Sequence, residues 1–136
     1  MAFEIVGLKN FDYQAAVDLA PLIDVNKYMK KHKKNKVQLH RIFWQGRRAG
    51  TMLTEIKNKY FGGRRLDILA ARTHGHVPNV SKQAYVKLSM MARRVGADEI
   101  AFQTKFSALA GAYQQLGGTV TGDGDYTVSL EVLNVR

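Results

Sequence analysis

The stretch from residue 66 to residue 104 constrains the fold more than any other part of the chain. It begins with a nearly continuous apolar run, Leu66–Ala71 (LDILAA), and continues through the loop RTHGHVPN into an amphipathic helical pattern that Gly96 ends. A second short apolar strand, Glu99–Thr104 (EIAFQT), follows. Because connections from strand through helix to strand are right-handed, the two strands are expected to be parallel neighbours. The continuous apolar character of the first strand predicts a central position, covered on both faces.

The loop between the first strand and the helix is a candidate anion site. Asn79 or Ser81 can cap the helix, whose first backbone N–H groups have no partner within it. These groups and the positive end of the helix dipole favour a phosphate. We therefore expect any nucleotide-like cofactor to bind beside the carboxyl end of the Leu66–Ala71 strand, where neighbouring strands diverge.

The N-terminal part of the sequence predicts one strand and two helices. Phe3–Leu8 reads as a strand, and Tyr13–Ala20 is rich in good helix formers that Asn10 or Asp12 can cap. Pro21 is expected to end that helix and to open the next at its first position. In this second helix one face is apolar, formed by Leu22, Val25, Tyr28 and Met29.

The remaining segments predict two hairpins and one more helix. Val37–Phe43 alternates with the period of a strand, the six residues QGRRAG form a turn, and Thr51–Tyr60 returns. A helix is predicted over Ser107–Leu116. After it, two strands flank the turn GDGD and form a hairpin, Thr119–Thr121 and Tyr126–Leu133. The predicted order is strand, two helices, three antiparallel strands, helix, strand, helix and terminal hairpin. This is an α/β chain with a mixed sheet (α+β).

Length and composition limit the class of protein. The 136 residues are enough for one domain, residues 1–136, with 46% hydrophobic and 24% charged residues, as in folded proteins. The sequence contains no cysteine, which excludes disulfides, thiolate metal sites and cysteine nucleophiles. No apolar run could cross a bilayer and no signal-peptide pattern opens the chain, so we expect a cytoplasmic protein without membrane attachment.

A formal charge of +10 points to an acidic partner. The densest basic segment is KKHKKNK, in which Lys30, Lys31, Lys33 and Lys34 are positioned to contact nucleic-acid phosphates or an acidic protein. The alternative is a solvated helix end and a basic surface that only aids solubility. His74 and His76 flank Gly75, but two histidines without a third ligand do not indicate a metal site.

The whole order of elements resembles the GNAT family of acyl-CoA-dependent N-acetyltransferases. The similarity covers nearly the whole chain. WQGRRAGTML resembles the family's hairpin, in which a glycine, here Gly50, opens the third strand, and AYQQLGG resembles its segment of alanine, tyrosine, three residues and glycine. The resemblance implies a GNAT fold, acetyl-CoA as cofactor and transfer of an acetyl group directly to an amine substrate.

The resemblance also implies a set of cofactor-binding residues around the central loop. Backbone groups of the Leu66–Ala71 strand would polarise the thioester, and the loop that follows would hold the CoA pyrophosphate. Val77 stands where the family usually has a small residue, and Pro78 lacks an N–H that could donate. The positions carried over are Leu69, Ala71, Arg72, Gly75, His76, Val77 and Asn79.

The chemistry implied by the resemblance needs an acid and a base. Tyr113 matches the family's tyrosine, which protonates the departing thiolate, although its neighbours on the helix equally fit a packing role. Glu55 and Asp67, on adjacent expected strands, are the candidates for the base. For either carboxylate the alternative is an ordinary ion pair with Arg64, Arg65 or a lysine.

Val77 and Pro78, which depart from the family pattern in the loop, favour a second hypothesis in which the protein is not an enzyme. In it the chain is a catalytically inactive GNAT-like protein that uses the fold as a basic binding module. It would be similar to small phage-borne GNAT-like proteins, either a virion component or a host-directed factor, and would occur in the host cytoplasm or the virion. The sequence leaves open a monomer or a homodimer.

Overall fold

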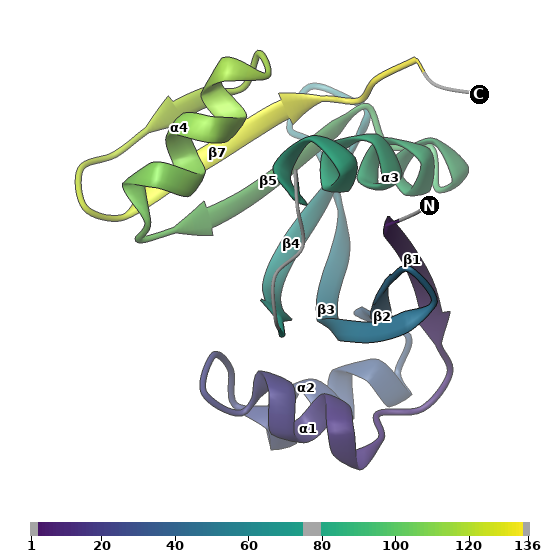
Figure 1. Cartoon of the computed structure of the whole chain (residues 1–136). Coiled ribbons are helices and arrows are strands. Elements are labelled where there is room, and N and C mark those ends of the chain that lie inside the picture. Colours follow the sequence, from purple (N-terminus) through teal and green to yellow (C-terminus); the bar gives the residue numbers. More distant parts are fainter. Residues whose placement is uncertain (1–2, 75–79, 135–136) are drawn as a thin grey trace. The chain divides into compact units, whose positions relative to one another are not determined.

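The computed structural model describes residues 3–74 and 80–134, with the side chains of residues 80 and 81 left out (Figure 1). Within these ranges the element order is the predicted one. The elements are β1 (Phe3–Leu8), α1 (Tyr13–Leu19), α2 (Val25–Lys33), β2 (Gln38–Trp44), β3 (Arg47–Asn58), β4 (Arg64–Thr73), α3 (Val80–Arg94), β5 (Glu99–Thr104), α4 (Ser107–Gln115), β6 (Thr119–Thr121) and β7 (Tyr126–Glu131). The hydrogen-bonded strand order is β1-β2-β3-β4-β5-β7-β6. None of the helices described here is both long and apolar enough to span a membrane.

The chain forms two compact units. The first comprises Met1–Glu55 and Leu69–Pro78, and the second comprises Ile56–Ile68 and Asn79–Arg136. Strands β3 and β4 each contribute residues to both units. The two units are described separately below.

The first unit contains an antiparallel arrangement of β1, β2 and β3. Its hairpin is tighter than the predicted six-residue turn, because Gln45 and Gly46 alone connect the strands. Both residues have positive φ, 50° and 78°, as a two-residue hairpin turn requires. The arginines that the sequence assigned to the turn are therefore the first residues of β3, and Gly50 lies inside that strand rather than at its start.

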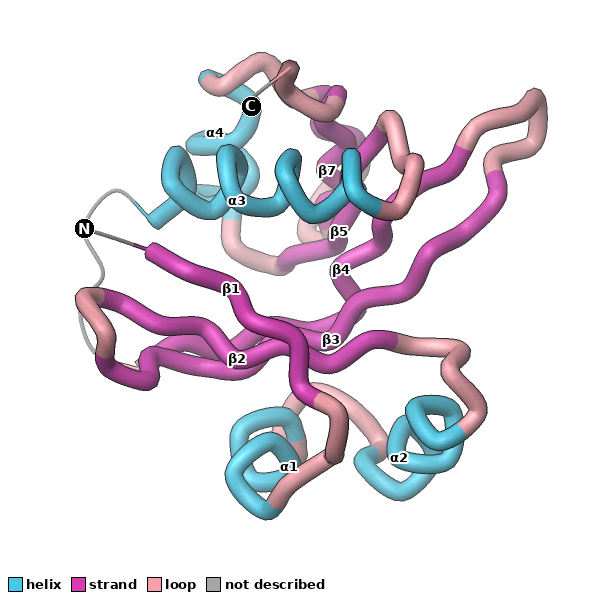
Figure 2. Tube along the Cα trace, turned by 90° about the vertical axis from the view of Figure 1, so that its right-hand side faces the viewer, coloured by secondary structure: helices cyan, strands magenta, loops and turns pink. Residues whose placement is uncertain are grey.

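Helices α1 and α2 pack beside this part of the sheet (Figure 2). Asp12 caps α1 as one of the two predicted candidates, and its carboxylate accepts from the Ala15 N–H at 2.8 Å. The predicted start of the second helix at Pro21 is wrong. Asp24 caps α2 instead, because its carboxylate can accept from the Lys27 N–H. Leu22 consequently lies outside the helix and is 52% exposed.

The core of the first unit joins the two helices to the strands. Its buried members come from α1, β2, β3, β4 and the residue before β2. Phe11 and Ile23, which precede the two helices, and Tyr28 of α2 pack against them. The buried members are Ala15, Leu19, Val37, Leu39, Leu53 and Ala70.

The second unit contains the predicted crossover. β4 pairs with β5 in parallel, from Arg65 opposite Glu99 to Ile68 opposite Phe102. The connecting helix α3 contacts α4, and together they pack on β5 and β7. The hairpin of β6 and β7 closes the unit around the predicted GDGD turn. The parallel pairing and the terminal hairpin are thus confirmed.

Candidate functional site

The carboxyl end of β4 is where the sequence predicted cofactor binding. Leu69 packs against the core of the first unit, whereas Ala71, Arg72 and His74 are exposed. An exposed arginine at the end of a strand suits an anionic ligand, because guanidinium binds phosphate in a bidentate manner. The other predicted cofactor positions, Gly75, His76, Val77 and Asn79, lie outside the described residues.

The same end of β4 passes unusually close to β3. A Cβ added to Gly50 would lie 2.0 Å from the Arg72 carbonyl oxygen, so only glycine fits at that position. Two residues further on, the His74 N–H donates to the Ala49 carbonyl at 2.6 Å. The glycine that the family resemblance singled out therefore serves to bring the two strands together.

A buried carboxylate lies beneath this end of the strand. Asp18 of α1 is 1% exposed and accepts from Thr51 Oγ1 at 2.6 Å and from Gln14 Nε2 at 2.9 Å. His74 Nε2 lies 2.8 Å from Asp18 Oδ1. Because an ionised carboxylate only accepts hydrogen bonds, Nε2 carries the proton in this contact. We refer to Asp18, Gln14, Thr51 and His74 as the Asp18 cluster.

The electrostatics of Asp18 follow from its partners. Burial by itself raises the pKa of the carboxyl, but the hydrogen bonds from Thr51, Gln14 and His74 outweigh burial. The pKa of Asp18 therefore lies below its ordinary value, and the group is ionised at neutral pH. Sequence reasoning missed this cluster, and the only signal was one aspartate inside the apolar segment AAVDLA.

Asp67, one of the two candidate bases, lies in the second unit among cations. It accepts from Arg65 Nε at 2.5 Å and from Arg65 Nη2 at 3.2 Å, and Lys57 Nζ lies 3.4 Å away. The bond to Asp67 raises the pKa of the Arg65 guanidinium. The structure thus contains the ion pair that the sequence offered as the alternative for this residue.

Asp67 belongs to a charged strip across the second unit. Lys59 Nζ lies 2.6 Å from Asp98 and 3.6 Å from Glu99, which in turn accepts from Ser129 Oγ at 3.0 Å. These contacts connect β4 and β5 to the strand on each side. We refer to Lys57, Lys59, Arg65, Asp67, Asp98 and Glu99 as the charged strip.

Tyr113, the candidate acid, is buried at the C-terminal end of α4. Its ring meets Phe102 of β5 edge to face, with centroids 5.0 Å apart. Burial raises the pKa of Tyr113 to about 12, so the phenol stays protonated at neutral pH. The register pairs Asp67 with Ala101 and Ile68 with Phe102, so the Asp67 side chain and the Phe102–Tyr113 contact lie on opposite faces of the sheet.

The remaining predicted residues occupy less enclosed positions. Glu55 is half-buried on β3. It is the last residue of Met1–Glu55, the first of the two segments that form the first unit. The four lysines of the basic segment lie in the last turn of α2 and at its C-cap, and three of them, Lys30, Lys33 and Lys34, are exposed. Cations at this end suit the negative end of the helix dipole.

Comparisons with known proteins bear on the fold. No protein-family model and no curated protein matches the sequence. The structure is similar to an acetyltransferase from Bacillus subtilis in complex with CoA, at 15% identity and a TM-score of 0.65, covering 96% of this chain and 99% of that one. It is also similar to an N-acetyltransferase from Staphylococcus aureus, at 12% identity and a TM-score of 0.67, covering 98% and 100%.

A third similar structure names the family. It is a GNAT family acetyltransferase from Elizabethkingia anophelis with acetyl-CoA bound, at 10% identity and a TM-score of 0.65, covering 95% of this chain and 97% of that one. All three likenesses extend over nearly the whole of both chains. They agree with the element order and with the mixed sheet described above. The chain therefore has the GNAT acetyltransferase fold.

Proposed function

We propose that this protein is a single-domain acetyl-CoA-dependent N-acetyltransferase that acts on an amine. The observation that carries the proposal is the exposed carboxyl end of β4, where the exposed Arg72 can meet a phosphate. The bound CoA and acetyl-CoA of two structural neighbours give the ligand class. The fold supports the same reading.

The described residues at this end of β4 fit an acyl-CoA. Arg72 supplies a cation for the pyrophosphate, and the backbone of Leu69 and Ala71 supplies N–H and C=O groups for the pantetheine arm and the thioester. Bound acetyl-CoA would supply an activated acyl group with a good leaving thiolate. The protein's own task is then to orient the amine, remove its proton and return a proton to the leaving sulfur.

Tyr113 and an acidic side chain are assigned the two proton transfers. Tyr113, with its pKa raised by burial to about 12, holds a proton throughout the physiological range and donates it to the thiolate. Glu55 and Asp67 are the two candidates for the base, and Asp67 accepts a proton less readily while Arg65 and Lys57 hold it. Either carboxylate would act directly or through one water.

Calorimetric titration of the protein with acetyl-CoA tests the cofactor assignment. We expect saturable binding, and no heat at about several hundred micromolar would refute an enzyme that uses acetyl-CoA. Arg72→Met is expected to weaken binding about tenfold, since it removes one charged phosphate contact. Arg48→Met is the matched control, because Arg48 is also exposed and lies on β3.

Steady-state kinetics test the acid. Tyr113→Phe keeps the ring against Phe102 and removes only the hydroxyl. We expect kcat to fall by about 10²-fold with an unchanged KM for acetyl-CoA. An unchanged kcat would leave Tyr113 with a packing role alone.

The second candidate function is a catalytically inactive basic module. The exposed lysines at the end of α2 favour it, with an acidic protein or a nucleic acid as partner. Replacing Lys30, Lys31, Lys33 and Lys34 by alanine should then flatten the salt dependence of nucleic-acid binding. An unchanged slope would remove these lysines from the interaction.

A further inference from the structure

The exposed side of α1 is apolar. Tyr13 and Val17 lie about one turn apart and are 84% and 44% exposed. Ala16 and Ala20 fall on the same side of the helix at helical spacing, and Ala20 is also exposed. We refer to these four residues as the outer face of α1. The buried residues of the helix lie on the opposite side and are Ala15, Asp18 and Leu19.

The distribution of charge in α1 is unusual for a helix at a protein surface. The segment YQAAVDLAPL, residues 13–22, contains a single charged residue, Asp18, and that residue is buried. Surface helices ordinarily turn their charged side chains toward water. Pro21 and Leu22 are exposed as well, so the apolar surface continues beyond the helix. A contiguous exposed apolar surface of this kind is typical of an interaction site.

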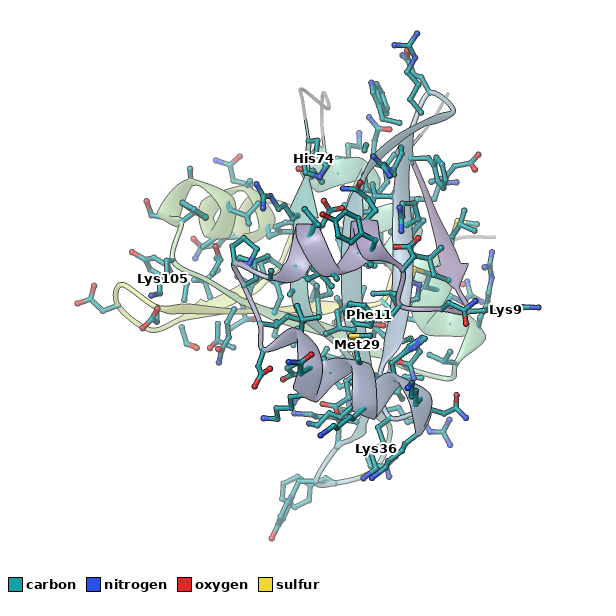
Figure 3. All side chains as sticks on the ribbon, turned by 90° about the horizontal axis from the view of Figure 1, so that it is seen from below. Lys9, Phe11, Met29, Lys36, His74 and Lys105 are labelled. Carbon is teal, nitrogen blue, oxygen red and sulfur yellow. The ribbon has the colours of Figure 1, made fainter. Side chains whose placement is uncertain are left out.

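Among the described residues of the first unit, no helix or strand covers the outer face. Figures 2 and 3 show α1 and α2 side by side, and Figure 3 views the two helices from outside. The labelled side chains of Phe11 and Met29 lie between the two helices in that view. The inner side of α1 contacts the core through Ala15 and Leu19. The outer face is therefore available to a partner.

The outer face is complementary to itself in the sizes of its side chains. If two α1 helices pair antiparallel about a two-fold axis between residues 16 and 17, Tyr13 faces Ala20 of the other copy. In the same arrangement Ala16 faces Val17 of the other copy. Each contact joins a larger side chain to an alanine, so the two helices can approach closely without leaving a void. The positive end of each helix dipole also lies beside the negative end of the other.

From the exposure of the outer face, its lack of charge and its order of large and small side chains, we propose that two copies of this chain associate through α1. The contact is antiparallel and two-fold symmetric. Four side chains on two helical turns cover less than the about 800 Å² that each partner buries in a stable dimer, so the dimer is weak, with a Kd of about 0.1–1 mM. The proposal does not depend on acetyl transfer, because the outer face contains none of the predicted cofactor or catalytic positions.

Sedimentation equilibrium from about 10 μM to about 1 mM tests the association. We expect a change from monomer to dimer over this range. Val17→Glu places two carboxylates near the two-fold axis and should weaken the dimer at least about tenfold, while glutamate favours a helix more than valine does. Val6→Glu is the matched control, because Val6 on β1 is 45% exposed and the net charge changes equally. A monomer at about 1 mM, or an equal loss in both variants, would overturn the proposal.

Salt and lipid distinguish this dimer from association with other partners. Each copy has a formal charge of +10 and the outer face is uncharged, so screening of the mutual repulsion should tighten the dimer between about 0.05 M and about 0.5 M NaCl. Binding to an acidic protein or a nucleic acid would weaken instead. A dimer that weakens in salt would contradict an uncharged contact. A chain that stays monomeric, but binds vesicles of phosphatidylserine and phosphatidylcholine unless Val17 is replaced by glutamate, would assign the outer face to a lipid surface and overturn the proposal.

Disulfide cross-linking tests the antiparallel arrangement. The chain contains no cysteine, so introduced thiols are the only ones that can react. A mixture of Tyr13→Cys and Ala20→Cys chains at about 1 mM should form the mixed disulfide about tenfold faster than either variant forms a disulfide with itself, because the two Cβ atoms must come within about 4.5 Å. Faster self-cross-linking of Tyr13→Cys would indicate a parallel pair and would overturn the proposed contact.

Discussion

Asp18 in the first unit and Asp67 in the second are both buried carboxylates, yet their surroundings are opposite in kind. Asp18 is 1% exposed and is surrounded by hydrogen-bond donors of an amide, a hydroxyl and an imidazole. Asp67 is 9% exposed and is held by cations, Arg65 and Lys57, whose side chains are 36% and 47% exposed. The Asp18 carboxylate is stabilised by hydrogen bonds from the protein, whereas Asp67 belongs to an ion pair whose cations are partly exposed to water.

This difference separates structural from functional candidates. A carboxylate that has three donors has little affinity for a further proton, and its loss leaves the buried Thr51 hydroxyl without an acceptor. Asp18 is therefore a structural anchor that holds His74 at the end of β4. The side chains of Arg65 and Lys57 can rotate away from Asp67 toward water. The ion pair therefore contributes less to the free energy of unfolding, and its contacts are more readily exchanged.

Removing the Asp18 carboxylate should produce the largest effect. Asp18→Ala leaves the buried Thr51 hydroxyl without an acceptor and removes the partner of Gln14 and His74, so we expect the free energy of unfolding to fall by about 2–4 kcal/mol. Urea denaturation followed by circular dichroism measures the change. Thr51→Val, which removes one donor only, should cost about 1–2 kcal/mol. Equal costs for the two variants would mean that the bonds from Gln14 and His74 to Asp18 contribute nothing measurable to stability.

The contrast between the two aspartates also shows what sequence can reveal. The order of elements was predictable because its signals are local in sequence. The period of the apolar residues distinguishes helices from strands, Gly96 ends a helix, and GDGD forms a hairpin turn. Asp67 was recognised because a charge inside an apolar strand is conspicuous. Asp18 was not, since its partners Thr51 and His74 are 33 and 56 residues away, and a helical aspartate ordinarily faces water.

The local errors have equally local causes. Asp24 was overlooked as a cap because Pro21 offered a plausible earlier start for α2. The predicted turn after Trp44 is too long because Arg47 and Arg48 resemble turn residues, although they begin β3. The positive φ of Gln45, which makes the two-residue turn possible, has no signature in the sequence. The close approach of Gly50 to Arg72 depends on strand pairing and could be suggested only by the family resemblance.

A substitution that moves β3 away from β4 should disturb the Asp18 cluster with the second largest loss of stability. In Gly50→Ala the new methyl group would lie 2.0 Å from the Arg72 carbonyl oxygen, so the backbone must move. We expect a loss of about 2–3 kcal/mol in thermal or urea unfolding. Gly7→Ala on β1 is the matched control, because nothing lies within 4 Å of its added Cβ. A similar loss in both variants would point to glycine flexibility rather than to the strand contact.

The stability that Asp18 contributes should depend on pH in a defined direction. Its folded pKa is lowered from 3.8, so the contribution is fully present above the unfolded pKa and is lost as pH falls through the folded pKa. The difference in unfolding free energy between the unmodified protein and Asp18→Asn should therefore be constant at neutral pH and shrink below about pH 4. Denaturation at several acidic pH values measures it. A difference that grows on acidification would contradict a lowered pKa.

Neutralising Asp67 should have the smallest effect, and salt should reveal its origin. Asp67→Asn keeps the side-chain volume and one acceptor for Arg65, so we expect a loss of about 1 kcal/mol or less. Because Arg65 and Lys57 are partly exposed, about 1 M salt should remove most of that loss, while the loss in Asp18→Ala should be nearly unaffected. Urea denaturation of both variants at low and high salt makes the comparison. If the Asp67→Asn loss persisted in salt, the charged strip would be as closed to water as the Asp18 cluster. Asp67 would then share the structural role of Asp18.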